Sequence, residues 1–327
     1  MGVRASKIHT RKRVLVTGGS GTLGYNILKQ LAAADQYTII APVRTQRPWL
    51  AEFKGKVQFL EHELSDPIHT AQIFERANPD VIVHCAASGL RPPRGSWFDL
   101  MHFNVESTMR LFQMNCRFDH HSHFIYISTG LVYREQGRPL LETDPIETLH
   151  PYGASKAAGD AMLQAAAAEF KRRLTILRPF AFTGIRDGGE RLFPRILCAA
   201  ESGTPLPMTE GTQIRDFCSV DDIAQSVLLA IENKKHEMID KFNLGSGQSR
   251  PLRELVTEVC RELEIQPRLQ YGCIPMHPYE PSHSVADISH ARAVLGWEPR
   301  HRLAHAVWQL ARETHPNLGI KEPERYA

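Results

Sequence analysis

Two side chains that can share a proton lie one helical turn apart in the segment Tyr152-Gly-Ala-Ser-Lys156. Residues four apart on a helix lie on the same face, so the lysine ammonium can sit near the tyrosine phenol. A phenol has an ordinary pKa of about 10, and a nearby ammonium together with an oxidised nicotinamide would favour the phenolate. Lowering that pKa by ~2–3 units requires ~3–4 kcal/mol of preferential phenolate stabilisation. The pair therefore predicts proton transfer beside a nicotinamide whose ribose hydroxyls Lys156 can hold.

Two further polar residues lie where the expected strands and helices would bring them to the same place. Thr129 ends the apolar run at 123–129, and open parallel sheets bind ligands at the carboxyl ends of their strands. The Thr129 hydroxyl can therefore hold a substrate oxygen beside the phenol. Asn104 lies on the preceding expected helix, at 97–117, and can support the lysine through a water molecule. A tyrosine and a lysine at this spacing occur often by chance, so the functional interpretation depends on the wider set.

A glycine-rich turn lies between the first expected strand and the first expected helix. Its glycines recur at every third residue, and glycine there permits a tight turn, close approach of a pyrophosphate, and packing of the helix on the strand. A nucleoside-triphosphate loop is excluded because Tyr25 stands where that loop needs a lysine. A purely structural turn is the remaining alternative. The turn and the free N–H groups of the helix N-terminus predict dinucleotide binding by Gly18, Gly21, Thr22, Leu23 and Gly24.

The end of the second expected strand bears on the choice of dinucleotide. An acidic residue there would bond the ribose 2′-OH of NAD, and an arginine would accommodate the 2′-phosphate of NADP. The sequence has no acid at this place; it has Ala-Pro-Val followed by Arg44, and then Arg47. Arg44 therefore favours NADP as the cofactor. NAD is the alternative if the two arginines are only solvated loop charges.

The first half of the chain alternates short apolar runs with amphipathic stretches. Continuous β-branched runs separated by helices are typical of a parallel sheet buried on both faces. We therefore expect an α/β protein, with a Rossmann-type doubly wound parallel sheet and a smaller C-terminal substrate lobe. The expected strands span 13–19, 37–44, 57–64, 80–87, 123–129 and 174–180, and the expected helices span 25–34, 68–77, 97–117 and 151–173.

The pattern changes after Phe180, where Gly, Pro and Arg become dense and the elements become short. This change predicts a division of the chain into a dinucleotide-binding part and a substrate-binding part. Within the second part, 220–232 reads as a helix and 241–246 as a strand that both return to the sheet. The expected units are an N-terminal arm at 1–12, an NAD(P)-binding Rossmann domain at 13–180 with returning elements at about 214–247, and a substrate-binding lobe at 181–213 and 248–320.

Composition and charge limit the classes of partner. Of the 327 residues, 42% are hydrophobic and 23% are charged, and the formal net charge is +3. This charge is too small to indicate nucleic acid or a membrane surface, and no segment approaches the ~20 apolar residues of a membrane span. The six cysteines are scattered without a Cys-x-x-Cys pair, which favours free thiols in a reducing compartment. We therefore expect a cytoplasmic enzyme with a small-molecule substrate and with no nucleic-acid or membrane partner.

No metal site is expected. His120, His121 and His123 lie close together before a strand, but no acidic partner accompanies them. A solvated surface turn explains these histidines.

Together these features resemble the extended short-chain dehydrogenase/reductase family, which includes nucleotide-sugar epimerases, dehydratases and 4-keto reductases. The resemblance extends from Val14 to about Leu310 and keeps the family's order and spacing. Its motifs are GGSGTLG (18–24), HCAAS (84–88), FNVEST (103–108), ISTGLVY (127–133), YGASK (152–156), LRPFAFTG (177–184), IRDFCSVDDIA (214–224), FNLGSGQ (242–248) and ADISHARAVLGWEP (286–299).

The resemblance implies roles for individual residues. It makes Thr129, Tyr152 and Lys156 a catalytic triad. It also implies that helices at about 97–117 and 152–170 pack against a second copy, giving a homodimer. The implied ligand contacts are Glu63 and Leu64 for the adenine, Ala86 and Ala87 for the cofactor cleft, and Ser88 and Arg215 for the substrate, with Arg215 on its diphosphate.

Departures from the family pattern refine the expected reaction. Gly130-Leu131 replaces the Asp-Glu pair that dehydratases use, which argues against dehydration. Ala181 stands in place of an asparagine after the sixth strand, and His277 and Glu280 occupy the stretch where a second diphosphate-binding arginine is usual. The missing arginine weakens the nucleotide-sugar assignment without removing it.

We therefore expect an NAD(P)-dependent oxidoreductase that acts on a carbonyl or carbinol carbon. A nucleotide-sugar 4-keto reductase is the first interpretation, because Arg44 favours NADP and hence net reduction. A nucleotide-sugar 4-epimerase with tightly held NAD is the alternative. Reduction of a small non-sugar carbonyl is also open. A non-catalytic NAD(P) sensor would predict a disrupted tyrosine, lysine and hydroxyl set, whereas all three are present.

Overall fold

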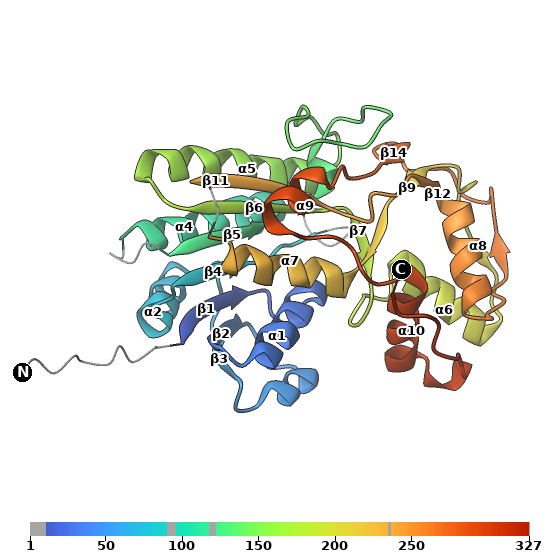
Figure 1. The fold of residues 1–327 in the computed structure, drawn as a ribbon, viewed down its shortest axis with the longest axis horizontal. Helices are drawn as coiled ribbons and strands as arrows, with labels where there is room; N and C mark the ends of the chain where they lie inside the picture. Colours follow the sequence, from blue (N-terminus) through green and yellow to red (C-terminus); the bar gives the residue numbers. More distant parts are fainter. Residues whose placement is uncertain (1–10, 90–95, 118–121, 235–236, 327) are drawn as a thin grey trace, which may run out of the picture.

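The computed structural model describes residues 11–89, 96–117, 122–234 and 237–326. A sheet of seven parallel strands lies at its centre, in the order β11-β6-β5-β4-β1-β2-β3 (Figure 1). The order reverses between β1 and β4, as in a doubly wound Rossmann-type sheet. The fold class expected from the sequence is confirmed. The strands are β1 (Lys12–Thr17), β2 (Tyr37–Val43), β3 (Val57–Glu61), β4 (Val81–His84), β5 (His123–Ile127), β6 (Leu174–Pro179) and β11 (Ile239–Leu244).

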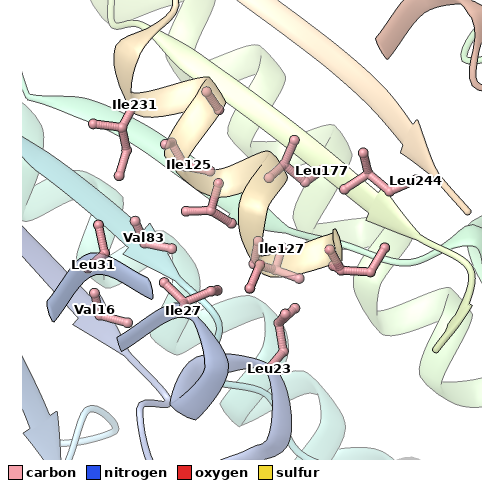
Figure 2. Packing of buried hydrophobic residues seen from close by; sticks show 14 of the residues in the cluster. Val16, Leu23, Ile27, Leu31, Val83, Ile125, Ile127, Leu177, Ile231 and Leu244 are labelled. Atoms are coloured by element: carbon pink, nitrogen blue, oxygen red, sulfur yellow. The ribbon is translucent and has the colours of Figure 1, made fainter. Parts of the chain in front are cut away.

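Helices cover both faces of the sheet, because both faces of each strand are apolar. In β1, Val14 and Val16 belong to one apolar cluster and Leu15 to the other, as alternate side chains of a strand must. Figure 2 shows Ile27 of the first helix and Ile231 of a later one over the same face. The helices on this face are α1 (Thr22–Ala34), α7 (Val220–Glu232) and α9 (Ser289–Leu295), and those on the other face are α2 (Pro67–Ala77), α4 (Ser107–Arg117) and α5 (Pro151–Phe170).

A third apolar cluster lies outside the sheet, at one end of the molecule (Figure 1). Phe193, Val256 and Val307 are buried at its centre. Its helices are α6 (Leu192–Ser202), α8 (Leu252–Glu262) and α10 (Leu303–Thr314). Short strands form small sheets beside it: β7 (Ala181–Thr183), β8 (Leu206–Pro207), β9 (Ile214–Arg215), β10 (Phe217–Ser219), β12 (Arg250–Pro251), β13 (Leu269–Gln270) and β14 (His283–Ser284).

Several helices differ from their expected bounds for local reasons. The first begins at Thr22 instead of Tyr25, directly after the glycine turn. The long helix ends at Phe170, because Lys171 adopts a left-handed φ of 50°. The helix expected at 97–117 is broken into α3 (Trp97–Met101), a π-helical turn η2 (His102–Glu106) and α4. The remaining elements are the 3₁₀ turns η1 (Pro48–Phe53), η3 (Gly130–Val132) and η4 (Pro316–Leu318).

The N-terminal arm expected at 1–12 lies almost wholly outside the described residues, and β1 already begins at Lys12. Within the described part of the chain, no helix is both long and apolar enough to cross a membrane.

Candidate active site

The glycine turn approaches the carboxyl ends of β1 and β4 very closely. Gly18 has a left-handed φ of +71°, and a Cβ there would lie 2.7 Å from the backbone nitrogen of Ala86. A Cβ on Gly24 would lie only 2.1 Å from the carbonyl oxygen of Gly18. Gly21 caps α1 without a side chain and donates its N–H to the same carbonyl at 3.0 Å. The turn therefore leaves the first amides of α1 directed at the sheet edge, an arrangement that fits a pyrophosphate.

A loop that follows β7 is bonded to the same end of α1. The hydroxyl of Thr22 donates to the carbonyl of Arg186 at 2.7 Å, and the amide of Asn26 donates to the carbonyl of Ile185 at 3.0 Å. Arg186 has a left-handed φ of 66° and forms an ion pair with Glu313 of α10 at 2.8 Å. This loop therefore joins the predicted cofactor turn to the third apolar cluster.

The guanidinium of Arg186 also lies over two aromatic rings. Its central carbon is 5.2 Å from the ring centroid of Tyr25 and 4.9 Å from that of Trp49. Leu23, which was also predicted to contact the dinucleotide, has a side chain that is buried in the core. Only its backbone can therefore face a ligand. Arg186 was not predicted from the sequence, because an arginine in a glycine-rich loop has the pattern of an ordinary solvated charge.

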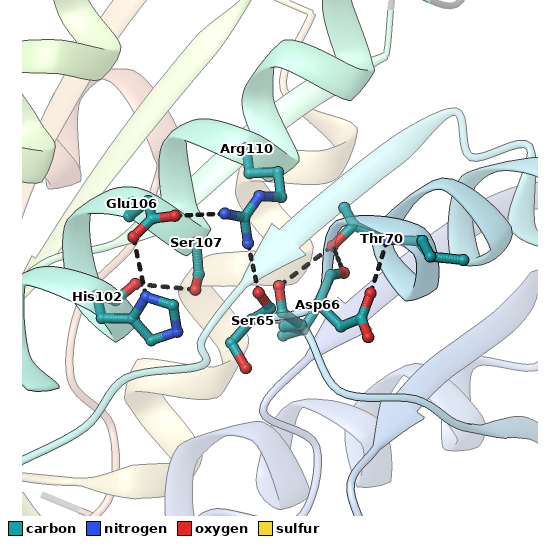
Figure 3. Close-up of polar contacts among 9 residues, drawn as sticks. Ser65, Asp66, Thr70, His102, Glu106, Ser107 and Arg110 are labelled. Atoms are coloured by element: carbon teal, nitrogen blue, oxygen red, sulfur yellow. Dashed lines mark hydrogen bonds and ion pairs between the residues drawn. The ribbon is translucent and has the colours of Figure 1, made fainter.

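The residues predicted to contact the adenosine half lie next to one another. Arg44 Nε and Glu63 Oε2 are 4.0 Å apart, and the Arg44 side chain is 74% exposed. Leu64 is partly buried against the apolar cluster on the α2 side of the sheet. Figure 3 shows that Arg110 of α4 donates to the carbonyl of Ser65, at 2.5 Å. The segment after β3 is therefore fixed, while Arg44 remains accessible to a ligand.

Asn104 ties the end of β4 to the start of α5. Its Oδ1 accepts from the Ser88 N–H at 2.7 Å, and its Nδ2 donates to the Ser88 carbonyl at 3.0 Å and to Ser155 Oγ at 2.9 Å. The π-helical turn places this amide, and the Thr108 hydroxyl donates to the Asn104 carbonyl at 2.8 Å. The water-mediated link from Asn104 to the next residue of α5, Lys156, stays a prediction.

Thr129 lies just after β5, where its side chain is nearly buried. Its Oγ accepts from the Leu131 N–H at 3.2 Å. A Cβ on Gly130 would meet the ring of Phe180 at 2.7 Å. The aspartate that dehydratases place here therefore does not fit while Phe180 packs in this position, which gives a steric reason for the Gly130-Leu131 sequence.

Lys156 is 1% exposed and lies on the inner face of α5. Its Nζ is 4.0 Å from the ring centroid of Tyr126 in β5, which is a favourable cation–π contact. Burial lowers the pKa of Lys156 to about 8, and the carboxylate of Asp160 acts in the opposite direction. Lys156 is therefore buried against β5, and its protonation state depends on the groups around it.

Tyr152 lies in the first turn of α5 and is half-buried. Burial raises the pKa of its phenol to about 12, and the positive charge of Arg191 opposes this effect. Within the chain alone, Arg191 rather than Lys156 is thus the cation that favours the phenolate. An oxidised nicotinamide would add a second positive charge beside the phenol. The contact between Tyr152 and Lys156 expected from their spacing stays a prediction.

Arg215, the predicted diphosphate contact, already has an acidic partner. Its Nη2 lies 2.6 Å from Glu280 Oε1, and the arginine side chain is 9% exposed. Glu280 lies in the stretch where a second diphosphate-binding arginine was expected from the family resemblance and is missing. A diphosphate that binds Arg215 must therefore compete with this carboxylate.

Of the three clustered histidines His120, His121 and His123, His123 is the one that the structure describes. In the described part of the chain, no group of three or more His, Cys, Asp or Glu side chains is arranged to hold a metal ion. His120 and His121 lie outside the described residues. The expectation of a solvated turn is wrong for His123, which is buried in β5 with its Nε2 2.8 Å from Thr175 Oγ1.

Comparison with protein-family models assigns the chain to a known group. The model of the NAD dependent epimerase/dehydratase family matches residues 14–245. The chain belongs to this family. It is therefore an NAD(P)-dependent enzyme of the short-chain dehydrogenase/reductase type, as the sequence motifs indicated.

Curated relatives of this family member include several epimerases. The UDP-glucose 4-epimerase of Halalkalibacterium halodurans is 26% identical, over 93% of this chain and 96% of the relative. The UDP-glucose 4-epimerase of Corynebacterium glutamicum is 27% identical, over 88% and 91%. Among solved structures, a Bacillus cereus UDP-glucuronic acid 4-epimerase in complex with UDP-glucuronic acid and NAD has a TM-score of 0.81 at 24% identity, covering 90% of this chain and 96% of that one. This likeness confirms the fold.

Removal of the Tyr152 hydroxyl tests the proton-transfer role. We expect Tyr152→Phe to lower turnover by about a hundredfold or more, the usual contribution of a positioned acid–base group. Dinucleotide affinity is expected to change little, because the glycine turn remains intact. Turnover is measured by product formation and affinity by NADH fluorescence. Near-normal turnover in Tyr152→Phe would assign the proton transfer to another group.

Proposed function

We propose that this family member is a nucleotide-sugar 4-epimerase that binds NAD at the glycine turn. The observation that carries the proposal is the sheet order, in which β1, β4 and β5 are adjacent and parallel, so that the glycine turn after β1 and Thr129 after β5 follow strands that end at the same edge. Tyr152 and Lys156, in the first turns of α5, are the proposed partners of that edge. The curated relatives named as UDP-glucose 4-epimerases favour epimerisation over the reduction expected first from the sequence. The steric barrier at Gly130 argues against dehydration.

The proposed roles of the side chains follow from their positions. When bound, the dinucleotide supplies a hydride acceptor and donor. Thr129 holds the substrate hydroxyl oxygen, and Tyr152 takes its proton as the carbinol carbon is oxidised. Lys156 offsets the charge of the phenolate and bonds the ribose hydroxyls. The keto sugar then rotates so that its opposite face meets the dinucleotide. The hydride returns to that face, and Tyr152 returns the proton to the oxygen.

The third apolar cluster and its short strands are proposed as the substrate-binding lobe, at 181–213 and 248–320. Arg215 supports this role because its guanidinium contacts the partly exposed carboxylate of Glu280, besides donating to the backbone carbonyl of Ile214. A substrate diphosphate can replace that carboxylate as the partner of Arg215. We also infer a reducing, cytoplasmic setting, which the six free cysteines support.

A reductase that uses NADP is the second candidate, and Arg44 is the observation that favours it. No acidic residue lies at the end of β2, where Val43 is followed directly by Arg44. The guanidinium of Arg44 is exposed, and its distance to the Glu63 carboxylate is 4.0 Å. A ribose 2′-phosphate would be a stronger partner, because guanidinium–phosphate contacts are charge-assisted.

Assays of purified protein separate the two candidates. We expect interconversion of UDP-glucose and UDP-galactose, or of UDP-glucuronic acid and UDP-galacturonic acid, without net consumption of dinucleotide. Products are resolved by chromatography, and the dinucleotide released on denaturation is identified. Stoichiometric oxidation of NADPH with a 4-keto sugar nucleotide would instead establish the reductase. Tyr152→Phe serves as the inactive control in both assays.

Replacement of Arg44 tests the cofactor assignment. If Arg44 binds a 2′-phosphate, Arg44→Ala should weaken NADPH binding by about tenfold and leave NADH binding unchanged, since one charge-assisted contact is lost. Arg47→Ala is the matched control, because the Arg47 guanidinium lies over the ring of Trp49 at 5.8 Å. Equal affinities of the wild-type protein for NADH and NADPH, unaffected by Arg44→Ala, would contradict a 2′-phosphate site.

We propose that the protein is a homodimer formed through α3 and α5. These helices pack against each other and carry large exposed apolar side chains, of which Phe98 is 85%, Trp97 64% and Met162 51% exposed. Exposed apolar side chains on two helices that pack together favour an interface, and a two-fold axis would bring the same helices of a second copy against them.

Substitution on this surface tests the dimer. We expect Phe98→Glu to shift the protein from dimer to monomer, because burying an unpaired carboxylate is costly. Ile68→Glu is the matched control, since Ile68 is 69% exposed on α2, a helix that is not part of the proposed interface. Sedimentation velocity measures the mass of each variant. A monomeric wild-type protein, or a dimer that survives Phe98→Glu, would contradict the proposal.

A further inference from the structure

The ammonium of Lys156 lies among groups that carry no charge near neutral pH. Burial lowers the pKa of His84 to about 3 and raises that of Cys85 to about 12, so both are neutral. Burial likewise raises the pKa of the Tyr126 phenol, whose ring lies under the ammonium. Tyr152 is also neutral, for the same reason. A cation in such surroundings tends to lose its proton unless a counter-charge lies nearby.

Asp160 provides that counter-charge from the same helix. It lies four residues after Lys156 in α5, so its carboxylate is on the same face one turn later. Its side chain is fully buried, so solvent does not screen its charge as it would at the surface. The side chains of Tyr152, Lys156 and Asp160 therefore follow one another along one face of α5.

The charge of Asp160 is itself held in place by Arg178 of β6. Arg178 Nε donates to Asp160 Oδ2 at 3.0 Å, and Nη2 lies 3.0 Å from the same oxygen, with both side chains fully buried. Burial raises the pKa of the Asp160 carboxyl, and Arg178 is the largest of the effects that lower it, followed by the Ser128 hydroxyl. The arginine is fixed in turn by the Tyr133 hydroxyl, to which Nη1 donates at 2.6 Å.

We propose that Asp160, fixed by Arg178, is a positioning residue that keeps Lys156 protonated and directed at the cofactor ribose and the phenol. The role rests on the proposed function of Lys156 and goes beyond it. It makes the buried ion pair a part of the site, with Arg178 next to the last residue of β6. An ion pair whose only role is to hold β6 to α5 would not set the charge of Lys156.

The two roles differ in their effect on the pH dependence of dinucleotide binding. The pKa of Lys156 is about 8 with Asp160 in place. Removing the negative charge lowers that pKa, so the ammonium and the affinity that depends on it are lost at lower pH. We expect the alkaline limb of NADH binding to move down by about one pH unit in Asp160→Asn. If the ion pair has a purely structural role, Asp160→Asn lowers the NADH affinity or the stability of the protein, but the alkaline limb of NADH binding stays at the same pH.

The experiment follows NADH fluorescence across neutral and alkaline pH for four variants. Asp160→Asn removes the charge and keeps the shape of the side chain. The double variant Asp160→Leu/Arg178→Met removes both charges without leaving an unpaired buried cation; it is expected to show a smaller shift in the same direction. Tyr133→Phe is the matched control, because it breaks the same network but leaves both charges. Lys156→Met gives the profile without the ammonium.

A shift in Asp160→Asn with an unmoved limb in Tyr133→Phe supports the proposal. The proposal is overturned if the alkaline limb of NADH binding lies at the same pH in the wild type and in Asp160→Asn. It is also overturned if Tyr133→Phe moves the limb as far as Asp160→Asn does. If Asp160→Asn does not fold, the double variant decides, and an unmoved limb there overturns the proposal. The epimerase proposal is contradicted by a different result, the absence of sugar-nucleotide turnover in the wild-type protein. The two results are independent, because the pH profile of NADH binding is measured without a substrate.

Discussion

The close approach of the glycine turn to the ends of β1 and β4 is the constraint on which the rest of the site depends. Gly18 touches the backbone at Ala86, and Gly24 touches Gly18, so no side chain fits at either glycine. This contact brings the amides at the start of α1 to the edge where β5 delivers Thr129. Because the strands are parallel and adjacent, groups from distant parts of the sequence meet there without a long loop to carry them.

Helix α5 supplies most of the remaining chemistry, and it does so at an energetic cost. It buries Lys156 and Asp160 against β5 and β6, where an unpaired charge would cost about 3–5 kcal/mol. The chain limits that cost with an aromatic ring under the ammonium and a guanidinium beside the carboxylate. The same burial raises the pKa of Tyr152. The site thus holds a neutral phenol next to a lysine whose charge depends on its neighbours.

The sequence was sufficient to predict features that repeat or that lie close together along the chain. Apolar runs predicted the strands of the central sheet, and three-residue spacing located the turn at Gly18, Gly21 and Gly24. The π-helical turn was not predictable, because it depends on the contacts of Asn104 with Ser88 and Ser155, which are 16 and 51 residues away. Long-range contacts of this kind leave no periodic signal in the sequence.

Charged residues were the least predictable part of the site for the same reason. Arg178 lies in an apolar strand, and nothing near it in the sequence shows that its partner is on α5. The guanidinium of Arg215 was expected to face a diphosphate, whereas Glu280 is its partner in the structure. In both cases the sequence identified a charge, and only the fold identified the group that neutralises it.

The Arg186 loop has a consequence for how long a dinucleotide stays bound. Its carbonyls accept from Thr22 and Asn26 of α1, while its guanidinium is paired with Glu313 of α10. Displacement of α10 would therefore pull on the segment that is bonded to the start of α1. The start of α1 and the C-terminal helix α10 are thus joined through one short loop, and an enzyme that keeps its cofactor through many turnovers would gain from the rigidity that the Glu313 contact gives this loop.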